Sequence, residues 1–328
     1  MTALNIVKND HSDSSSSPSR KHLVKNAKLK EIQAIFERRW LLNPEAFDPL
    51  RNCMTRECLE RTWSLLIQTI NPLEKKAVDI GCGMGVLSKR LHEAKVSQIT
   101  VLDIAENALK RLKETNLENI QYACEAMPFT TLADQHYDII ICTDLIGEIP
   151  QEYHRLFFAE LSRLISADGD LVFSSSIDID SEGGVDKLKE LIKTEFDLTH
   201  EILSFHVLYL RLKKLLRYPY LCTEGWSDLT FREKELNQRK GLNRAWYWIN
   251  TTPILVWLWY VMNPIAHRLL HILKNNRTIL LFLEKICHFI SDQDGISHVI
   301  FIAKRRSLQP INPKDIPITK PGKKEIWE

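Results

Sequence analysis

The sequence has no apolar run that could cross a membrane, because the run at residues 253–262 is ten residues long and a spanning helix needs about 20. It also has no excess of one charge, with 44 Lys plus Arg against 42 Asp plus Glu. This balance gives no global signature of nucleic-acid binding, so any basic surface must be local.

Residues 1–22 are polar and Ser-rich and lack the apolar core of a signal peptide. We therefore expect a cytoplasmic protein with a disordered tail over residues 1–24.

Paired cysteines and metal-binding patterns are missing as well. The seven cysteines, at positions 53, 58, 82, 124, 142, 222 and 287, form no CxxC pair. Their odd number and wide scatter favour reduced thiols over a disulfide framework or a zinc site. His267, His271 and His288 have helical spacing, but no acid or thiol stands at matching positions. The sequence therefore predicts no metal site.

What is present is an alternation of short apolar runs with helical segments. Apolar residues recur at three and four positions over 27–40 and again after Thr55, a candidate N-cap, which predicts two N-terminal helices. Five predicted strands follow, at 77–80, 98–104, 119–124, 137–143 and 170–177. Helical stretches separate most of them. This order predicts an α/β fold with a doubly wound, Rossmann-like parallel sheet.

The rest of the chain divides into three further parts. A core of residues 25–206 ends with one more helix and a sixth strand. Residues 207–295 are helical, aromatic and basic, and they are too long and too apolar for a loop, so we expect an inserted subdomain. Residues 296–306 would supply the last strand of the core sheet. The Pro-rich, basic tail 307–328 is incompatible with regular helix or an inner strand.

A glycine turn, VDIGCGMG at residues 78–85, follows the first predicted strand. In a doubly wound fold this turn faces the ligand crevice, and glycine lets the backbone approach the ligand closely. A dinucleotide fingerprint needs a glycine where Val86 stands, and the lysine of a P-loop is absent. Asp79 precedes the turn and Asp103 ends the second strand. A carboxylate at that strand end is suited to accept both hydroxyls of a ribose.

With these residues the chain resembles the class I S-adenosylmethionine-dependent methyltransferases. The resemblance covers residues 76–177, extends to 206 and returns at 296–305. It implies that Asp79 helps to hold the methionine ammonium, that the turn borders the methionine, and that Asp103 takes the ribose. Next to the adenine the family has an acid where Ala123 stands, so Glu125, or the backbone of residues 124 and 125, would take that place. The implied cofactor-binding residues are Asp79, Gly81, Cys82, Gly83, Gly85, Asp103, Ile104, Cys124 and Glu125.

Candidate catalytic groups lie near the end of the fourth strand. Methyl transfer from a sulfonium requires alignment of the acceptor, and a general base is needed only when the acceptor must lose a proton. Asp144, Glu148 and His154 are the candidates, although Glu148 and His154 equally fit a role as helix caps or solvent-facing groups. Residues 143–146 lack the NPPY-like run of enzymes that methylate adenine, cytosine or glutamine amino groups.

The inserted segment is where acceptor specificity is expected. It carries Trp residues at 246, 248, 257 and 259, and residues 205–306 hold 16 Lys plus Arg against 7 Asp plus Glu. This composition fits a helical lid or core over an apolar acceptor. It also fits contact with an anionic membrane surface, in which the rings lie at headgroup level, or contact with a protein partner.

The sequence thus predicts an S-adenosyl-L-methionine-dependent methyltransferase acting on a small, apolar or lipid-like acceptor such as a quinone precursor. The alternatives are methylation of protein or RNA, for which the basic excess would be the docking surface, and a non-catalytic binding module that keeps the cofactor fold. The expected location is cytoplasmic or peripheral on the inner face of the membrane, and no DNA partner is expected.

Overall fold

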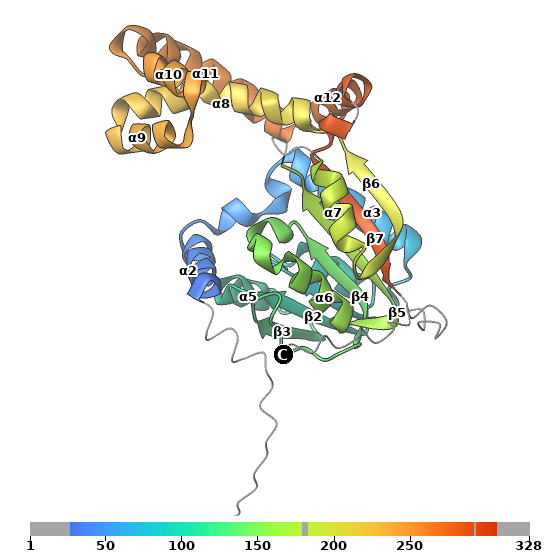
Figure 1. The fold of residues 1–328 in the computed structure, drawn as a ribbon. Helices are drawn as coiled ribbons and strands as arrows, with labels where there is room; N and C mark the ends of the chain where they lie inside the picture. The colour runs from blue at the N-terminus through green and yellow to red at the C-terminus, as the bar shows by residue number, and fades with distance from the viewer. Residues whose placement is uncertain (1–26, 179–182, 292, 307–328) are drawn as a thin grey trace, which may run out of the picture.

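The computed structural model describes residues 27–178, 183–291 and 293–306. The predicted tails, residues 1–24 and 307–328, lie outside these described ranges. Within them the chain forms an α/β core from which a group of helices projects (Figure 1).

A seven-stranded sheet in the order β3-β2-β1-β4-β5-β7-β6 forms the centre of the core. Strands β1 to β5 are parallel, and β7 is antiparallel to both of its neighbours. This arrangement confirms the predicted doubly wound α/β sheet. The strand bounds are β1 Lys76–Ile80, β2 Gln98–Asp103, β3 Ile120–Cys124, β4 Tyr137–Thr143, β5 Ile165–Ser176, β6 Phe196–Ser204 and β7 His298–Arg305.

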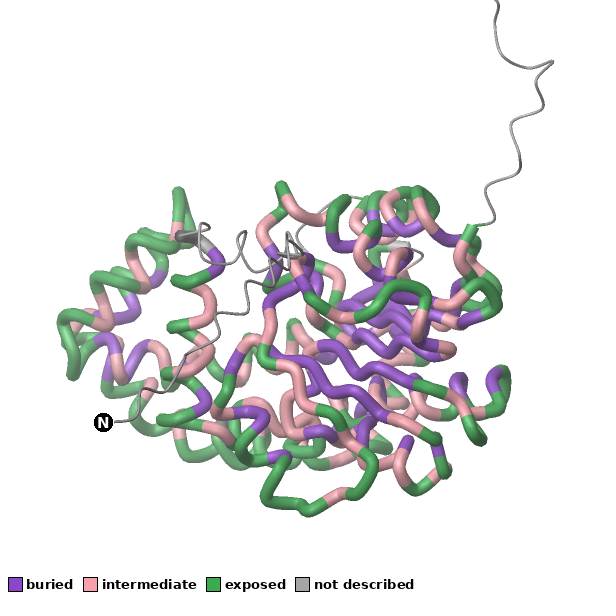
Figure 2. The backbone as a smooth tube through the Cα atoms, turned by 90° about the horizontal axis from the view of Figure 1, so that it is seen from below, coloured by how far each residue is buried: buried purple, intermediate pink, exposed green. Residues whose placement is uncertain are grey.

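Helices cover both faces of this sheet, which explains why the middle of the inner strands is mostly apolar. One apolar cluster packs one face of the sheet against α6 and α7. A second packs the other face against α3, α4 and α5. Figure 2 shows the buried strands as a continuous layer inside the core. The helix bounds are α3 Cys53–Thr69, α4 Val86–Glu93, α5 Glu106–Lys113, α6 His154–Leu164 and α7 Gly184–Ile192.

The N-terminal helices lie beside the carboxyl ends of the strands. Helix α2 (Ala27–Leu42) packs against α5, and the short helices η1 (Pro44–Phe47) and η2 (Pro49–Arg51) connect it to α3. The prediction that Thr55 caps α3 was wrong. Asn52 is the N-cap, and its side-chain oxygen accepts a hydrogen bond from the Thr55 backbone N–H at 3.0 Å. Asn is as good a cap as Thr, and it stands three residues earlier.

Five helices between β6 and β7 account for the inserted segment. Helices α8 and α11 pack along each other and extend away from the sheet, with α9 and α10 at the far end, whereas α12 stays at the base (Figure 1). We call α8 to α11 the arm. Bounds are α8 Val207–Ser227, α9 Leu229–Gln238, α10 Gly241–Asn250, α11 Pro253–Asn275 and α12 Arg277–Ile290.

No helix in the described ranges is long and apolar enough to cross a membrane.

Ion pairs attach α12, at the base of the arm, to α3. The guanidinium of Arg61 binds both carboxylate oxygens of Glu284 on α12, with N···O distances of 2.6 Å. Arg277, which begins α12, pairs with the buried Glu57 of α3 at 2.6 Å. The carboxyl-terminal end of the insertion is therefore fixed to the helix that also borders the cavity described next.

Candidate active site

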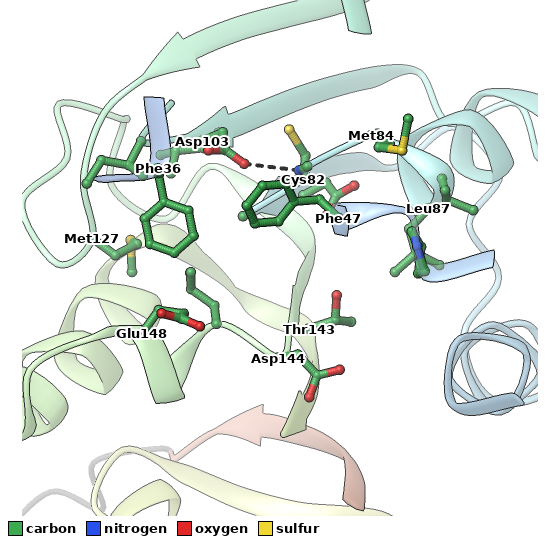
Figure 3. Close-up of a pocket in the computed structure, with 18 of the residues that line it drawn as sticks. Phe36, Phe47, Cys82, Met84, Leu87, Asp103, Met127, Thr143, Asp144 and Glu148 are labelled. Atoms are coloured by element: carbon green, nitrogen blue, oxygen red, sulfur yellow. Dashed lines mark hydrogen bonds between the residues drawn. The ribbon is translucent and has the colours of Figure 1, made fainter. Parts of the chain in front are cut away.

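A cavity of about 310 Å³ opens at the carboxyl ends of β1, β2 and β4. In open α/β sheets this edge is where ligands bind. Aromatic side chains of α2 and η1 form its roof: Trp40 stacks on Phe47 with ring centroids 4.6 Å apart, and Phe36 lies 6.0 Å from Phe47. Figure 3 shows the rings of Phe36 and Phe47 between Asp103 on one side and Glu148 and Asp144 on the other.

The backbone of the glycine turn is left-handed at three positions. Gly81, Gly83 and Gly85 have φ values of 72°, 52° and 67°, in the left-handed region that favours glycine. Asp103 holds the turn, because its carboxylate accepts hydrogen bonds from the backbone N–H of Gly83 at 3.0 Å (dashed in Figure 3) and of Ala105 at 2.9 Å. The turn is thus fixed against the end of β2 and leaves its backbone beside the cavity.

Asp79 is a buried carboxylate at the same edge. It accepts a hydrogen bond from the Ser88 hydroxyl, and its side chain borders the cavity. Burial raises its pKa to about 6, and the nearby negative charge of Asp103 acts in the same direction. Burial also raises the pKa of Asp103. A cationic ligand would therefore stabilise the ionised form of both acids.

All the charged side chains that line this cavity in the described part of the chain are acids. Phosphate groups would meet no Lys, Arg or His there, whereas a ligand with positive charges would meet several carboxylates. The remaining lining is mostly apolar and aromatic. The acids are Asp79, Asp103, Glu125, Asp144 and Glu148.

The structure brings together seven of the nine residues predicted to bind the cofactor. Asp79, Gly81, Cys82, Gly83, Asp103, Ile104 and Glu125 border the cavity. Gly85 and Cys124 are not among the described residues that line it. Gly85 instead packs on α5, where an added Cβ would lie 2.3 Å from a Leu112 methyl carbon. The exposed Cys124 thiol lies 3.7 Å from the Ile104 carbonyl oxygen.

The three catalytic candidates also divide into residues that border the cavity and one that does not. Asp144 and Glu148 border the cavity, whereas His154 is not among its described lining residues. The Nε2 atom of His154 lies 3.0 Å from the Ile149 carbonyl oxygen, so this ring ties the start of α6 to the preceding turn. Asp144 has a φ of 51°, a left-handed conformation that Asp adopts more readily than most residues.

Sequence reasoning missed several residues of the site. Phe36 and Trp40 are among the apolar residues that predict the helix over 27–40, but nothing in that pattern shows that the helix roofs a cavity. Cys58 also lines the cavity, and the buried His298 contacts Asp144 from the start of β7. Only the packing of distant segments brings these groups to one place.

None of the described residues in 207–291 lines the cavity. The interpretation of the insertion as an acceptor lid therefore receives no support from this cavity. The roof is built instead by the N-terminal helices.

The strand order, the glycine turn and the acidic cavity are those expected of a class I S-adenosylmethionine-dependent methyltransferase domain. Residues 77–169 match the family model described as a methyltransferase domain, and this range holds strands β1 to β4 and the glycine turn.

Several known proteins are similar to this part of the chain. The ubiquinone biosynthesis O-methyltransferase of Idiomarina loihiensis is 32% identical over 107 residues, 31% of this chain and 42% of that protein. The enzyme of the same name from Bordetella bronchiseptica is 30% identical over 133 residues, 39% of this chain and 52% of that protein. The chain thus spans about half the length of these curated relatives.

Among solved structures, the N-methyltransferase NodS of Bradyrhizobium japonicum with S-adenosyl-L-homocysteine aligns with a TM-score of 0.46 and 16% identity. It covers 52% of this chain and 89% of that one.

Proposed function

We propose that the protein transfers the methyl group of S-adenosylmethionine to a small apolar acceptor. The observation that carries this proposal is the charge of the cavity, whose described charged residues are all acids beneath an aromatic roof. S-adenosylmethionine has a sulfonium, an ammonium and no phosphate, so it fits such a lining, whereas nicotinamide dinucleotides and ATP do not.

The residues of the cavity suggest how the donor would lie. The two oxygens of Asp103 suit the two ribose hydroxyls, and the carboxylate of Asp79 suits the methionine ammonium. Displacement at the sulfonium methyl group requires an aligned acceptor and a site without competing water. The stacked rings of Trp40 and Phe47, with Phe36 beside them, supply an apolar cover for that purpose.

The nature of the acceptor follows from the apolar part of the lining and from the relatives. Phe36, Leu59, Met84 and Met127 border the cavity, so the acceptor needs an apolar body. The similar proteins are described as ubiquinone biosynthesis O-methyltransferases. We infer an acceptor oxygen on a small quinone-type or other lipid-like molecule. RNA fits poorly because the described lining offers it no basic group.

We further propose that the arm docks on an anionic membrane surface, where such acceptors reside. Exposed aromatic and aliphatic side chains cover α10 and α11, among them Trp246 at 59%, Trp257 at 63% and Ile254 at 78% exposure. Residues 207–291 contain 13 Lys plus Arg against 5 Asp plus Glu. Aromatic rings beside basic residues match the interface of a bilayer that carries negative lipids.

Calorimetry tests the cofactor part of this proposal. We expect S-adenosylmethionine and S-adenosylhomocysteine to bind and NAD⁺ not to bind. Because burial raises the pKa of Asp79 to about 6, its carboxylate is mostly protonated at pH 5 and mostly ionised at pH 7. Affinity for the donor should therefore rise about tenfold between these pH values. Adenosine, which lacks the ammonium, should show a much smaller change.

Absence of donor binding, or an affinity for the donor that pH does not change, contradicts the assignment.

A further inference from the structure

A cluster of buried titratable groups adjoins the wall of the cavity at Cys58. Cys58 on α3 is 5% exposed and forms part of the cavity wall. His206, the residue before α8, is fully buried, and His298, the first residue of β7, is 4% exposed. The sheet register explains their proximity, because His298 lies opposite Ser176 of β5 and Ser204 of β6, two residues before His206.

His298 contacts the cavity-lining Asp144 and lies beside Cys58. Its Nε2 atom lies 3.3 Å from Oδ2 of Asp144, while Oδ1 of Asp144 accepts hydrogen bonds from the backbone N–H of Ser176 at 2.7 Å and its hydroxyl at 2.9 Å. The other ring nitrogen, Nδ1, is buried and has no hydrogen-bond partner among the described residues. The Cys58 thiol adjoins this ring and that of His206. The order Cys, His and Asp is that of an activated nucleophile or base with an orienting acid.

The charges around the thiol favour its ionised form. Burial would raise the pKa of Cys58, but the His206 and His298 rings lower it to about 7. Although burial opposes it, Asp144 and the thiol raise the pKa of His298 to about 10. A thiolate paired with an imidazolium is therefore the expected state near neutral pH.

Other charged groups face the cluster from the surrounding helices. Glu284 of α12 lies 3.6 Å from Nε2 of His206, and although burial opposes it, the neighbouring Cys58 and Glu284 raise the pKa of His206. Glu284 is itself neutralised by Arg61, which also contacts Glu57. The carboxylates of α3 and α12 are thus paired with guanidinium groups, which leaves the two imidazoles as the cations beside the thiol.

We propose that Cys58 is the catalytic base that takes the proton of the acceptor hydroxyl, with His298 and Asp144 as positioning residues. This inference rests on the proposed methyl transfer to oxygen. Asp144 is a weaker base than Cys58. Its carboxylate already accepts three hydrogen bonds, and the His298 contact holds its pKa below the usual value in spite of burial.

The chemical step balances without any further reactant. The acceptor O–H bond breaks and its proton moves to the Sγ atom of Cys58. The oxygen electron pair then forms the new bond to the methyl group, while the electron pair of the broken S–CH3 bond remains on the donor sulfur, which becomes a neutral thioether. A thiol with a pKa of about 7 can return the proton to water before the next turnover.

The ionisation of Cys58 can be measured without an acceptor. We would follow alkylation by iodoacetamide as a function of pH, with mass spectrometry to separate Cys58 from Cys124, whose pKa is raised by its surroundings. Half-maximal alkylation of Cys58 is expected near pH 7, and His298→Gln or His206→Gln should move it upward by about one pH unit or more. His200→Gln, which changes an exposed histidine on β6, should leave it unchanged.

A Cys58 that titrates at or above pH 9 in the wild type overturns the proposal, as does a midpoint that neither histidine variant moves. If a histidine variant fails to fold, the wild-type curve still decides.

The second experiment measures transfer of labelled methyl groups to a prenylated catechol as the probe. Cys58→Ser keeps the shape of the wall but lacks an ionisable group near neutral pH, so kcat should fall on the order of 100-fold, with S-adenosylmethionine affinity within twofold. In His298→Gln the acid limb of kcat/KM should move to higher pH, which a purely structural role would not cause. Full kcat in Cys58→Ser, or an unmoved acid limb, overturns the proposal.

Failure of the proposed function has a different signature. If the wild type binds the donor but methylates no hydroxyl probe, transfer to oxygen and the base role of Cys58 are both contradicted. The alkylation curve then shows separately whether the thiol is activated.

Discussion

Replacing Asp103 with alanine is expected to weaken the binding of S-adenosylmethionine on the order of 100-fold. Two charge-assisted hydrogen bonds to the ribose would be lost, each contributing about 1.5 kcal/mol or more, and 1.4 kcal/mol corresponds to a factor of ten. The same carboxylate accepts hydrogen bonds from the backbone of Gly83 and Ala105, so its removal also loosens the glycine turn. Calorimetry with the donor measures the effect.

Asp138→Asn is the matched control. Asp138 also accepts hydrogen bonds, from the Lys76 backbone N–H at 3.0 Å and the Ser166 hydroxyl at 3.2 Å, but it lies at the opposite end of β4. Its substitution should leave donor affinity unchanged. Unchanged affinity in Asp103→Ala would contradict the assignment of the ribose site.

The second large effect is expected at the arm. A variant with Trp246, Trp248 and Trp257 all changed to serine should lose most of its sedimentation with anionic liposomes, with a partition coefficient lower by on the order of 100-fold. Each ring is more than half exposed in the structure, and its transfer to the bilayer interface would contribute about 1 kcal/mol. The basic residues of the arm add an attraction that salt should weaken.

Leu41 and Leu42 provide a control for exposed apolar surface elsewhere. They are 70% and 68% exposed on α2, outside the arm, and their change to serine should not reduce liposome binding. A wild type that stays in the supernatant at low salt contradicts membrane docking. If the tryptophan variant instead dissolves a dimer seen in sedimentation velocity, a second copy of the chain is the partner of this surface.

The sequence was sufficient for those parts of the site that depend on local structure. The backbone of the glycine turn depends only on a short segment, and Asp103 ends its own strand, so the position of both at the carboxyl edge of the sheet could be inferred locally. Gly85 was assigned to the ligand although it serves the packing of α5, because contact with Leu112 depends on how helix and sheet meet. Glycine patterns show backbone shape but not which neighbour demands it.

The remainder of the site depends on contacts between distant segments. Cys58 lies on α3, Asp144 directly follows β4 and His298 begins β7, and they meet because β7 inserts antiparallel between β5 and β6. No periodicity in the sequence carries that information. Composition predicted that the insertion is helical and aromatic. It did not show that the arm extends away from the cavity, because the direction of a helix pair depends on how its ends are held to the core, here in part through α12 and its ion pair with Arg61 of α3.

Transfer of a labelled methyl group from S-adenosylmethionine into separated lipid, protein and RNA extracts tests the proposed activity most directly. We predict label in the lipid fraction with the wild type, and a loss of that label with Asp103→Ala. Label confined to protein or RNA would contradict a small apolar acceptor. Absence of label from all three fractions would contradict methyl transfer itself and favour a binding module that retains the cofactor fold.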